Sequence, residues 1–147
     1  MADDTRPNWL DRLTSTARIN PDDFSYKISR NRAVSLGYAL AGWLYMLRWQ
    51  RNTRIQGVAS LVVLALAVLL RVSFVELAIL ILSITIVWMA EFINAAVEAV
   101  VNLASPDYHP MAKVAKDVAA AAVLLGVVAS VLISLLIFGP PLLDLVT

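Results

Sequence analysis

Three long runs of apolar residues occupy the later part of the chain. They cover residues 54–70, 73–104 and 111–138, and the third remains uncharged as far as Leu143. A helix needs about 20 predominantly apolar residues to cross a bilayer. Each run approaches or exceeds this length, so the pattern predicts three membrane-spanning helices. The second run would be about 45 Å long as a helix, and its last turns should emerge from the hydrocarbon.

Short polar segments separate these runs. The segment RVSFVE, residues 71–76, is a tight turn, and it forces the second span to run antiparallel to the first. The segment SPDYHP, residues 105–110, is a loop, and Pro110 suits the first turn of the helix that follows. A Gly-Pro-Pro sequence at residues 139–141 is expected to stop the third helix.

The segment before the first span, residues 28–50, has a mixed pattern. Arginines flank an apolar middle with interspersed Tyr and Trp residues, a combination that suits the headgroup zone of a bilayer. The uncharged stretch 33–47 is shorter than a spanning helix requires. We therefore expect an amphipathic helix along the cytoplasmic interface, with a break allowed near Gly37 or Gly42. The alternative is a first spanning helix.

Composition and charge place these helices in a membrane. Hydrophobic residues make up 60% of the 147 residues and charged residues 16%, against about 25% charged in soluble domains. The acidic and basic segment 1–27 reads as a cytoplasmic polar tail, and residues 28–147 as one membrane domain. All Lys and Arg residues except Arg71 lie before residue 55 or at positions 113 and 116. The positive-inside rule then places the N-terminus in the cytoplasm and predicts a multi-pass membrane protein. A net charge of +1 gives no reason to expect a nucleic-acid partner.

Four polar residues interrupt the second apolar run near its end. Glu91, Asn94, Glu98 and Asn102 lie within about 80° of one helix face. Acids near hydrocarbon are retained when they have a partner or a task, so this stripe is the candidate functional site. The alternative is an interhelical salt bridge, such as Glu98 with Lys116, which would explain only one of the acids.

The start of the third span adds a second polar pair, Lys116 and Asp117. A lysine at this depth can reach phosphate groups. The single histidine, His109, has no second His or Cys with which to form a zinc site. Carboxylate and amide oxygens instead suit Mg²⁺. The sequence contains neither a Walker A loop nor the protein-kinase motifs.

These residues resemble the prokaryotic diacylglycerol kinase family of small membrane lipid kinases, which includes undecaprenol kinases. The resemblance rests on E-x-x-N-x-A-x-E-A-V-V at residues 91–101, Y-H-x-x-x-x-x-A-K-D at 108–117 and A-A-A-V-L-L at 120–125. G-Y-A-x-x-G at 37–42 and Q-R-N-x-R-I at 50–55 also fit. It implies an all-α membrane protein, with an interfacial helix and three transmembrane helices, that assembles as a homotrimer with sites between subunits.

The resemblance also implies an activity and residue roles. The family transfers the γ-phosphate of ATP to a lipid hydroxyl, with Mg²⁺ as cofactor. Glu91 matches the general base. The metal ligands are matched by Glu98 and Gln50. The positions that match nucleotide- or substrate-binding residues are Tyr38, Asn94, Asn102, Lys116 and Asp117.

Two positions depart from the family pattern, because Gln50 and Asn102 stand where the family has acidic residues. Both changes remove negative charge, so we expect weaker Mg²⁺ binding. The leading interpretation is a diacylglycerol kinase that forms phosphatidic acid. The alternatives are an undecaprenol kinase, and a catalytically impaired family member that acts as a membrane interaction protein.

Overall fold

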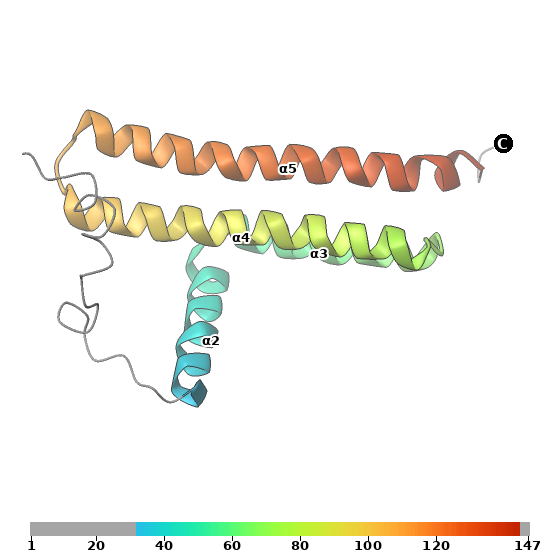
Figure 1. Ribbon diagram of the computed structural model, residues 1–147, viewed down its shortest axis with the longest axis horizontal. Coiled ribbons are helices and arrows are strands. Elements are labelled where there is room, and N and C mark those ends of the chain that lie inside the picture. The colour runs from blue at the N-terminus through green and yellow to red at the C-terminus, as the bar shows by residue number, and fades with distance from the viewer. Residues whose placement is uncertain (1–31, 145–147) are drawn as a thin grey trace, which may run out of the picture. The chain divides into compact units, whose positions relative to one another are not determined.

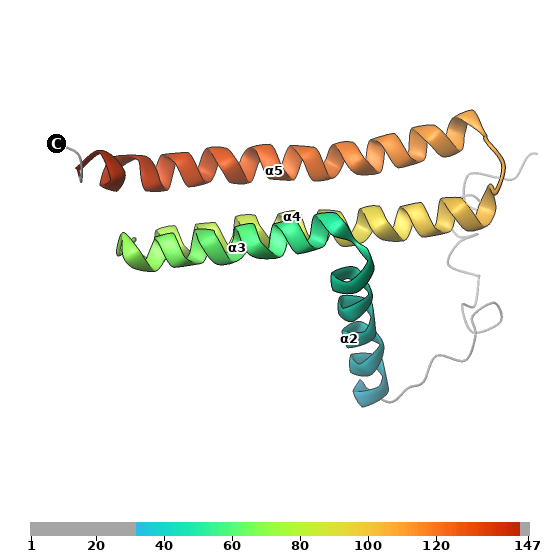
Figure 2. The ribbon, with the colours of Figure 1, turned by 180° about the vertical axis from the view of Figure 1, so that it is seen from behind.

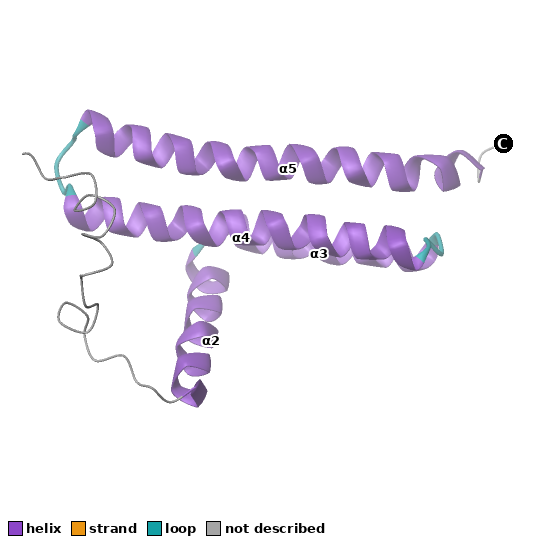
Figure 3. Cartoon of the chain, in the orientation of Figure 1, coloured by secondary structure: helices purple, strands orange, loops and turns teal. Residues whose placement is uncertain are grey.

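The computed structural model describes residues 32–144, and all regular structure within them is helical. Its helices are α2 (Arg32–Trp49), α3 (Arg51–Leu69), α4 (Phe74–Ala104) and α5 (Pro110–Asp144), as Figures 1 and 3 show. The expected all-α architecture is therefore confirmed for this part of the chain. The tail at residues 1–27 and the start of the interfacial helix at 28–31 lie outside the described residues.

The chain divides into two compact units, Met1–Gly42 and Trp43–Thr147. Helix α2 begins in the first unit and ends in the second. Residues 32–42, the described part of the first unit, are all solvent-exposed. The second unit contains the last turns of α2 and the three long helices, and it is the part that builds the candidate site.

Helices α3, α4 and α5 are each long and apolar enough to cross a membrane. In the most apolar 18-residue stretch of α4, only 22% is buried inside the protein. In the corresponding stretch of α5, only 6% is buried. An exposed apolar surface of this size must face lipid or other protein chains. The chain is therefore a membrane protein. The three predicted spans are confirmed as helices that are long and apolar enough to cross a membrane.

Helix α4 packs against both other spans, and α3 and α5 run alongside it in Figures 1 and 2. The buried core is formed by Ala67, Leu80 and Phe138, one residue from each span. These residues lie near the end of α3, the start of α4 and the end of α5. The core therefore closes the end of the unit that is remote from the polar stripe.

Small residues let α4 and α5 approach closely. A Cβ added to Gly126 would lie 3.6 Å from Cγ2 and 3.8 Å from Cα of Val87. One turn along, the hydroxyls of Ser83 and Ser130 lie 3.3 Å apart and share a hydrogen bond. Small residues and serine hydroxyls are the usual means of packing helices in a bilayer, where hydrophobicity gives no preference for helix–helix contact.

The turn between α3 and α4 has a well-defined start signal. Ser73 accepts a hydrogen bond from the backbone N–H of Glu76, and the Glu76 carboxylate accepts one from the backbone N–H of Ser73. This capping box satisfies two N–H groups that the first helical turn leaves without partners. Arg71 adopts a positive φ of 52° just before it. The sequence S-F-V-E carries this signal, which the hydrophobic pattern alone does not reveal.

The structure corrects one expected helix end. Helix α5 continues through Pro140 and Pro141 to Asp144, so the Gly-Pro-Pro sequence does not stop it. The fixed φ of proline is compatible with helix, and in a membrane helix the carbonyls that lose their donors are re-satisfied locally. Helix α2 is also continuous through Gly37 and Gly42, where a break had been allowed.

The spans differ in length, and this difference exposes one end of α4. Helix α3 has 19 residues and α4 has 31, or about 28 Å and 46 Å. Because a short turn joins the two, α4 extends well beyond the start of α3 (Figures 1 and 2). Glu91 lies near the level where α3 begins, and Asn94, Glu98 and Asn102 lie on the extension.

Candidate active site

Glu91 is the buried acid of the molecule's membrane unit, with only 3% of its surface exposed. The side-chain amide of Asn52, in the first turn of α3, hydrogen-bonds the Glu91 carboxylate. A carboxyl group removed from water is costly unless it is hydrogen-bonded. Burial and this amide partner together hold the Glu91 carboxylate in one position.

Glu91 opens onto a groove of about 710 Å³ between α3 and α5. Ile84 and Val87 of α4 also line this α3–α5 groove, and apolar side chains dominate its walls down to Phe138. Asn52, Gln56 and Ser60 form a polar edge along α3. A mostly apolar groove with a few converging polar groups is the usual form of a ligand site, and this one fits a molecule with a hydrocarbon tail and a polar head.

The predicted stripe turns from the interior to solvent along α4. Glu91 is buried, Asn94 is half-buried, and Glu98 and Asn102 are exposed. Glu98 makes no salt bridge among the residues that the structure describes, so the alternative interpretation of a Glu98–Lys116 ion pair is wrong for this chain. Its carboxylate is left available for a ligand.

Lys116 bonds to the stripe at a different residue. Its Nζ donates a hydrogen bond to Oδ1 of Asn102 at 2.6 Å, which links the end of α4 to the start of α5. Asp117 instead accepts a hydrogen bond from Lys113, one turn earlier on the same helix, and forms a salt bridge with it. The structure thus brings Lys116 and Asn102 together, whereas the local partner of Asp117 is a lysine that the sequence analysis did not single out.

The donor groups at this end suit Mg²⁺ by their chemistry. Gln50 is the N-cap residue of α3, and its side chain makes no capping hydrogen bond, so its amide oxygen remains available. Glu98 supplies a carboxylate. No group of three or more His, Cys, Asp or Glu side chains comes together within residues 32–144. Mg²⁺ usually takes only one or two protein carboxylates plus substrate phosphates, so Glu98 and Gln50 fit such a partial donor set.

Tyr38, the remaining predicted binding residue, belongs to the first unit. It lies on α2 and is 65% exposed. Its role stays a prediction, as do the roles of the other site residues.

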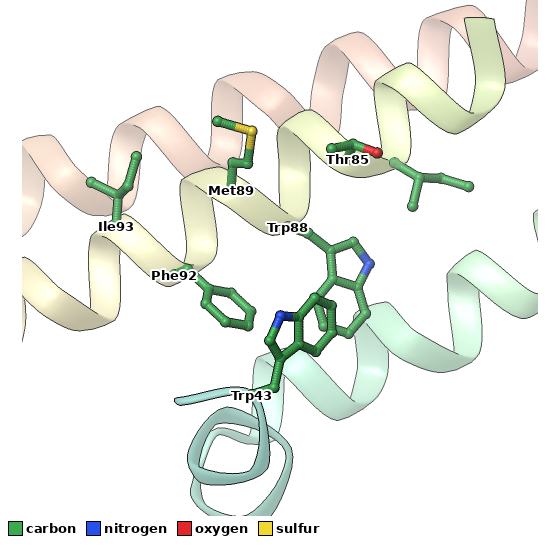
Figure 4. Close-up of a pocket in the computed structure, with 7 residues that line it drawn as sticks. Trp43, Thr85, Trp88, Met89, Phe92 and Ile93 are labelled. Carbon is green, nitrogen blue, oxygen red and sulfur yellow. The ribbon is translucent and has the colours of Figure 1, made fainter. Parts of the chain in front are cut away.

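An aromatic pocket lies on another side of α4, and Figure 4 shows its side chains. Trp43 stacks on Trp88 with ring centroids 4.9 Å apart, and Phe92 lies 5.0 Å from Trp43. Trp88 also donates a hydrogen bond from Nε1 to Oγ of Ser60 at 3.1 Å. The pocket measures about 460 Å³ and has almost wholly apolar walls. These ring contacts join Trp43 of α2 to α4 within one turn of Glu91.

Two polar residues of the groove, Asn52 and Gln56, were not predicted as site residues. Asn52 was present in the motif Q-R-N-x-R-I but received no role. The signal that could have found both is their spacing, because residues four apart on a helix share one face. They place two amides on the face of α3 that meets Glu91.

Comparisons with known proteins show which family the chain is similar to. The family model described as prokaryotic diacylglycerol kinase matches residues 37–138. A diacylglycerol kinase of Synechocystis sp. is 39% identical over 122 residues, which cover 82% of this chain and 70% of the relative. An undecaprenol kinase of Bacillus subtilis is 40% identical over 95 residues, 65% of this chain and 77% of the relative. A diacylglycerol kinase of Pseudomonas aeruginosa is 33% identical over 105 residues, 71% and 85% respectively.

Proposed function

Because the chain belongs to the prokaryotic diacylglycerol kinase family and is a membrane lipid kinase, we propose that it phosphorylates diacylglycerol with ATP to give phosphatidic acid. The observation that carries this proposal is the buried Glu91 carboxylate at the head of the apolar α3–α5 groove. A lipid whose tail occupies the groove presents its hydroxyl to Glu91. The relative from Synechocystis, whose match covers 82% of this chain, carries the same substrate in its name.

Glu91 acts as the general base in this proposal. It takes the proton of the lipid hydroxyl while the hydroxyl oxygen bonds to the γ-phosphorus of ATP. The bond between that phosphorus and the β–γ bridging oxygen breaks, and ADP leaves. Asn52 holds the carboxylate in position through its hydrogen bond. Such positioning supplies much of the catalysis in phosphoryl transfer.

The nucleotide binds at the polar end of α4 and α5. Lys116 contacts the phosphates, and Asn94, Asn102 and Asp117 shape the nucleotide site. Glu98 and Gln50 would hold Mg²⁺ at this end of the site. When bound, the ion offsets phosphate charge, which is the main electrostatic requirement of the reaction.

The distance between the base and the lysine supports a homotrimer with sites between subunits. Asn102, the partner of Lys116, lies eleven residues after Glu91 on the same helix, about 16 Å along its axis. The phosphates of one ATP molecule can reach a base and a lysine more readily when a second copy of the chain supplies one of these two groups. The large apolar surfaces of α4 and α5 provide area for such contacts.

The charge pattern supports a placement in the inner membrane with the N-terminus in the cytoplasm. In that placement α2 lies along the cytoplasmic interface as an amphipathic helix. The loop between α4 and α5 and the start of α3 then lie at the same face, where ATP is available. The polar side chains of the site then lie at the cytoplasmic face of the membrane.

A mixed-micelle assay with labelled ATP tests the proposal. The purified protein is incubated separately with diacylglycerol and with undecaprenol. Phosphate on diacylglycerol is the expected result. Preferential labelling of undecaprenol would support the second candidate, which the 40% identity to the Bacillus subtilis enzyme favours. Labelling of neither lipid would instead support the impaired interaction protein.

A further inference from the structure

Trp88 connects α4 to both of the helices that precede it. Its indole Nε1 donates a hydrogen bond to Oγ of Ser60 on α3 at 3.1 Å. Its ring lies over Gly57 of the same helix, where an added Cβ would be 3.8 Å from Cζ2 of the indole. The ring also stacks on Trp43 of α2, with centroids 4.9 Å apart. One side chain of α4 therefore contacts α2 and α3 together.

The Ser60 hydroxyl is oriented to accept the indole hydrogen bond. It donates its own hydrogen to the backbone oxygen of Gln56, one turn earlier, at 2.8 Å, which leaves its lone pairs for Trp88. Ser60 and Trp88 are both half-buried, and the N–H of a buried tryptophan usually has a partner. Where water is excluded, loss of the bond would leave that N–H unpaired at a cost. The bond therefore stabilises one spacing of α3 and α4 at this level.

Asn52 depends on this spacing because it lies far from the buried core. Ala67, the core residue of α3, is fifteen residues further along the helix, or about 22 Å. Over this length, a tilt of α3 by about 5° would displace Asn52 by about 2 Å, which is enough to break a hydrogen bond. Ser60 lies between the two residues, and Trp88 lies three residues before Glu91, the partner of Asn52. The Trp88 contact therefore restrains such a tilt close to the site.

We propose that Trp88 is a positioning residue for phosphoryl transfer, which fixes α3 against α4 and so holds the Asn52 amide on the Glu91 carboxylate. This inference rests on the proposed function, in which Glu91 is the base. In this role Trp88 acts through Asn52 rather than on the lipid or the nucleotide. Its loss should therefore lower kcat and leave the KM for ATP unchanged, because catalysis is sensitive to displacements of this size.

Two variants, Trp88→Phe and Ser60→Ala, remove the donor and the acceptor of the same hydrogen bond. Each should lower kcat by about tenfold, the fold-change that corresponds to one hydrogen bond of about 1.4 kcal/mol. The double variant should be no slower than either single one, because both changes remove the same interaction. Trp49→Phe is the matched control, since Trp49 is 65% exposed and contacts Arg48, and it should keep the wild-type kcat.

The decisive measurement repeats Trp88→Phe in an Asn52→Ala background. If the indole acts by holding Asn52, the change should lower kcat there by less than about twofold, since the group that it positions is already absent. A contribution of Trp88 to stability alone would give the same fold-loss in both backgrounds, and that result would overturn the inference.

The remaining outcomes separate this inference from the proposed function. Wild-type kcat in both Trp88→Phe and Ser60→Ala, or an equal loss in Trp49→Phe, would overturn the role of Trp88 while the kinase activity stands. If Trp88→Phe fails to fold, Ser60→Ala carries the same test in both backgrounds, because it removes a single hydroxyl. Absence of phosphate transfer by the wild type to any lipid would remove the proposed function and this inference with it.

Discussion

Lys116, in the second turn of α5, donates a hydrogen bond to Asn102, in the last turn of α4, with Nζ 2.6 Å from Oδ1. The bond joins the two residues across the loop at residues 105–109. It holds the Lys116 ammonium at the end of α4, where the nucleotide phosphates are proposed to bind. The neutral Asn102 acceptor leaves the lysine charge uncompensated and available to phosphate.

Removal of this acceptor should weaken ATP binding. In Asn102→Ala, Lys116 loses its anchor, and the KM for ATP should rise by about tenfold, since hydrogen bonds to charged groups contribute about 1.5–3 kcal/mol before screening by water. Steady-state kinetics at saturating lipid measures this. Asn102→Asp retains an acceptor and should keep the lysine in place. An unchanged KM for ATP in Asn102→Ala would contradict a phosphate-binding role for Lys116 in this position.

Restoration of a carboxylate at Gln50 should strengthen Mg²⁺ binding. Gln50 caps α3 without a side-chain capping bond, so Gln50→Glu should not disturb the helix start. Adding a carboxylate to a site for a hard divalent cation should lower the Mg²⁺ concentration at half-maximal rate by several-fold to about tenfold. A titration of activity against Mg²⁺ at constant ionic strength checks this. An identical Mg²⁺ dependence in the two proteins would argue against Gln50 as a metal ligand.

Asn52 should affect turnover more than nucleotide binding. In Asn52→Ala the Glu91 carboxylate loses the amide that orients it, and kcat should fall by roughly 10–100-fold, with little change in the KM for ATP. Asn52→Gln retains an amide and should recover part of the rate. If kcat falls equally in Asn52→Ala and Asn52→Gln, the amide is not the group that matters.

Because α4 and α5 are in close contact, only a small side chain should be tolerated at Gly126. A methyl group there meets Val87 at 3.6 Å, which is an ordinary contact distance, so Gly126→Ala should leave thermal stability in detergent nearly unchanged. Gly126→Leu overpacks the contact and should destabilise the protein by about 1–3 kcal/mol. The thermal unfolding of both variants measures the difference. Equal stability of Gly126→Leu and wild type would show that the helices separate more easily than the structure indicates.

Much of this architecture is predictable from the sequence because membrane spans have a strong hydrophobic signal. The start of α4 and the loop before Pro110 follow from the places where that signal is interrupted. The 100° rotation per residue places Glu91 and Asn102 on one stripe of α4. Burial along the stripe does not follow from that rotation, because it depends on where α3 begins relative to α4.

Contacts between separate helices account for most of what the sequence did not reveal. The bond from Asn52 to Glu91 joins residues of different spans, and no local pattern indicates which residues meet. The same holds for the stacking of Trp43 on Trp88. The end of α5 was predicted wrongly for a different reason. A proline removes one backbone hydrogen bond and its ring crowds the carbonyl four residues earlier, but α5 continues through Pro140, as membrane helices can.

The role of Glu91 as the base is the central claim, and turnover of Glu91→Gln tests it most directly. The variant keeps the shape of the side chain and removes the proton acceptor, so lipid phosphorylation should fall by at least about 10²-fold, while the purified protein retains wild-type helix content and oligomeric state. Glu76→Gln is the matched control, because glutamine also serves at this position of a capping box, and it should keep full activity. Wild-type turnover in Glu91→Gln would contradict the account.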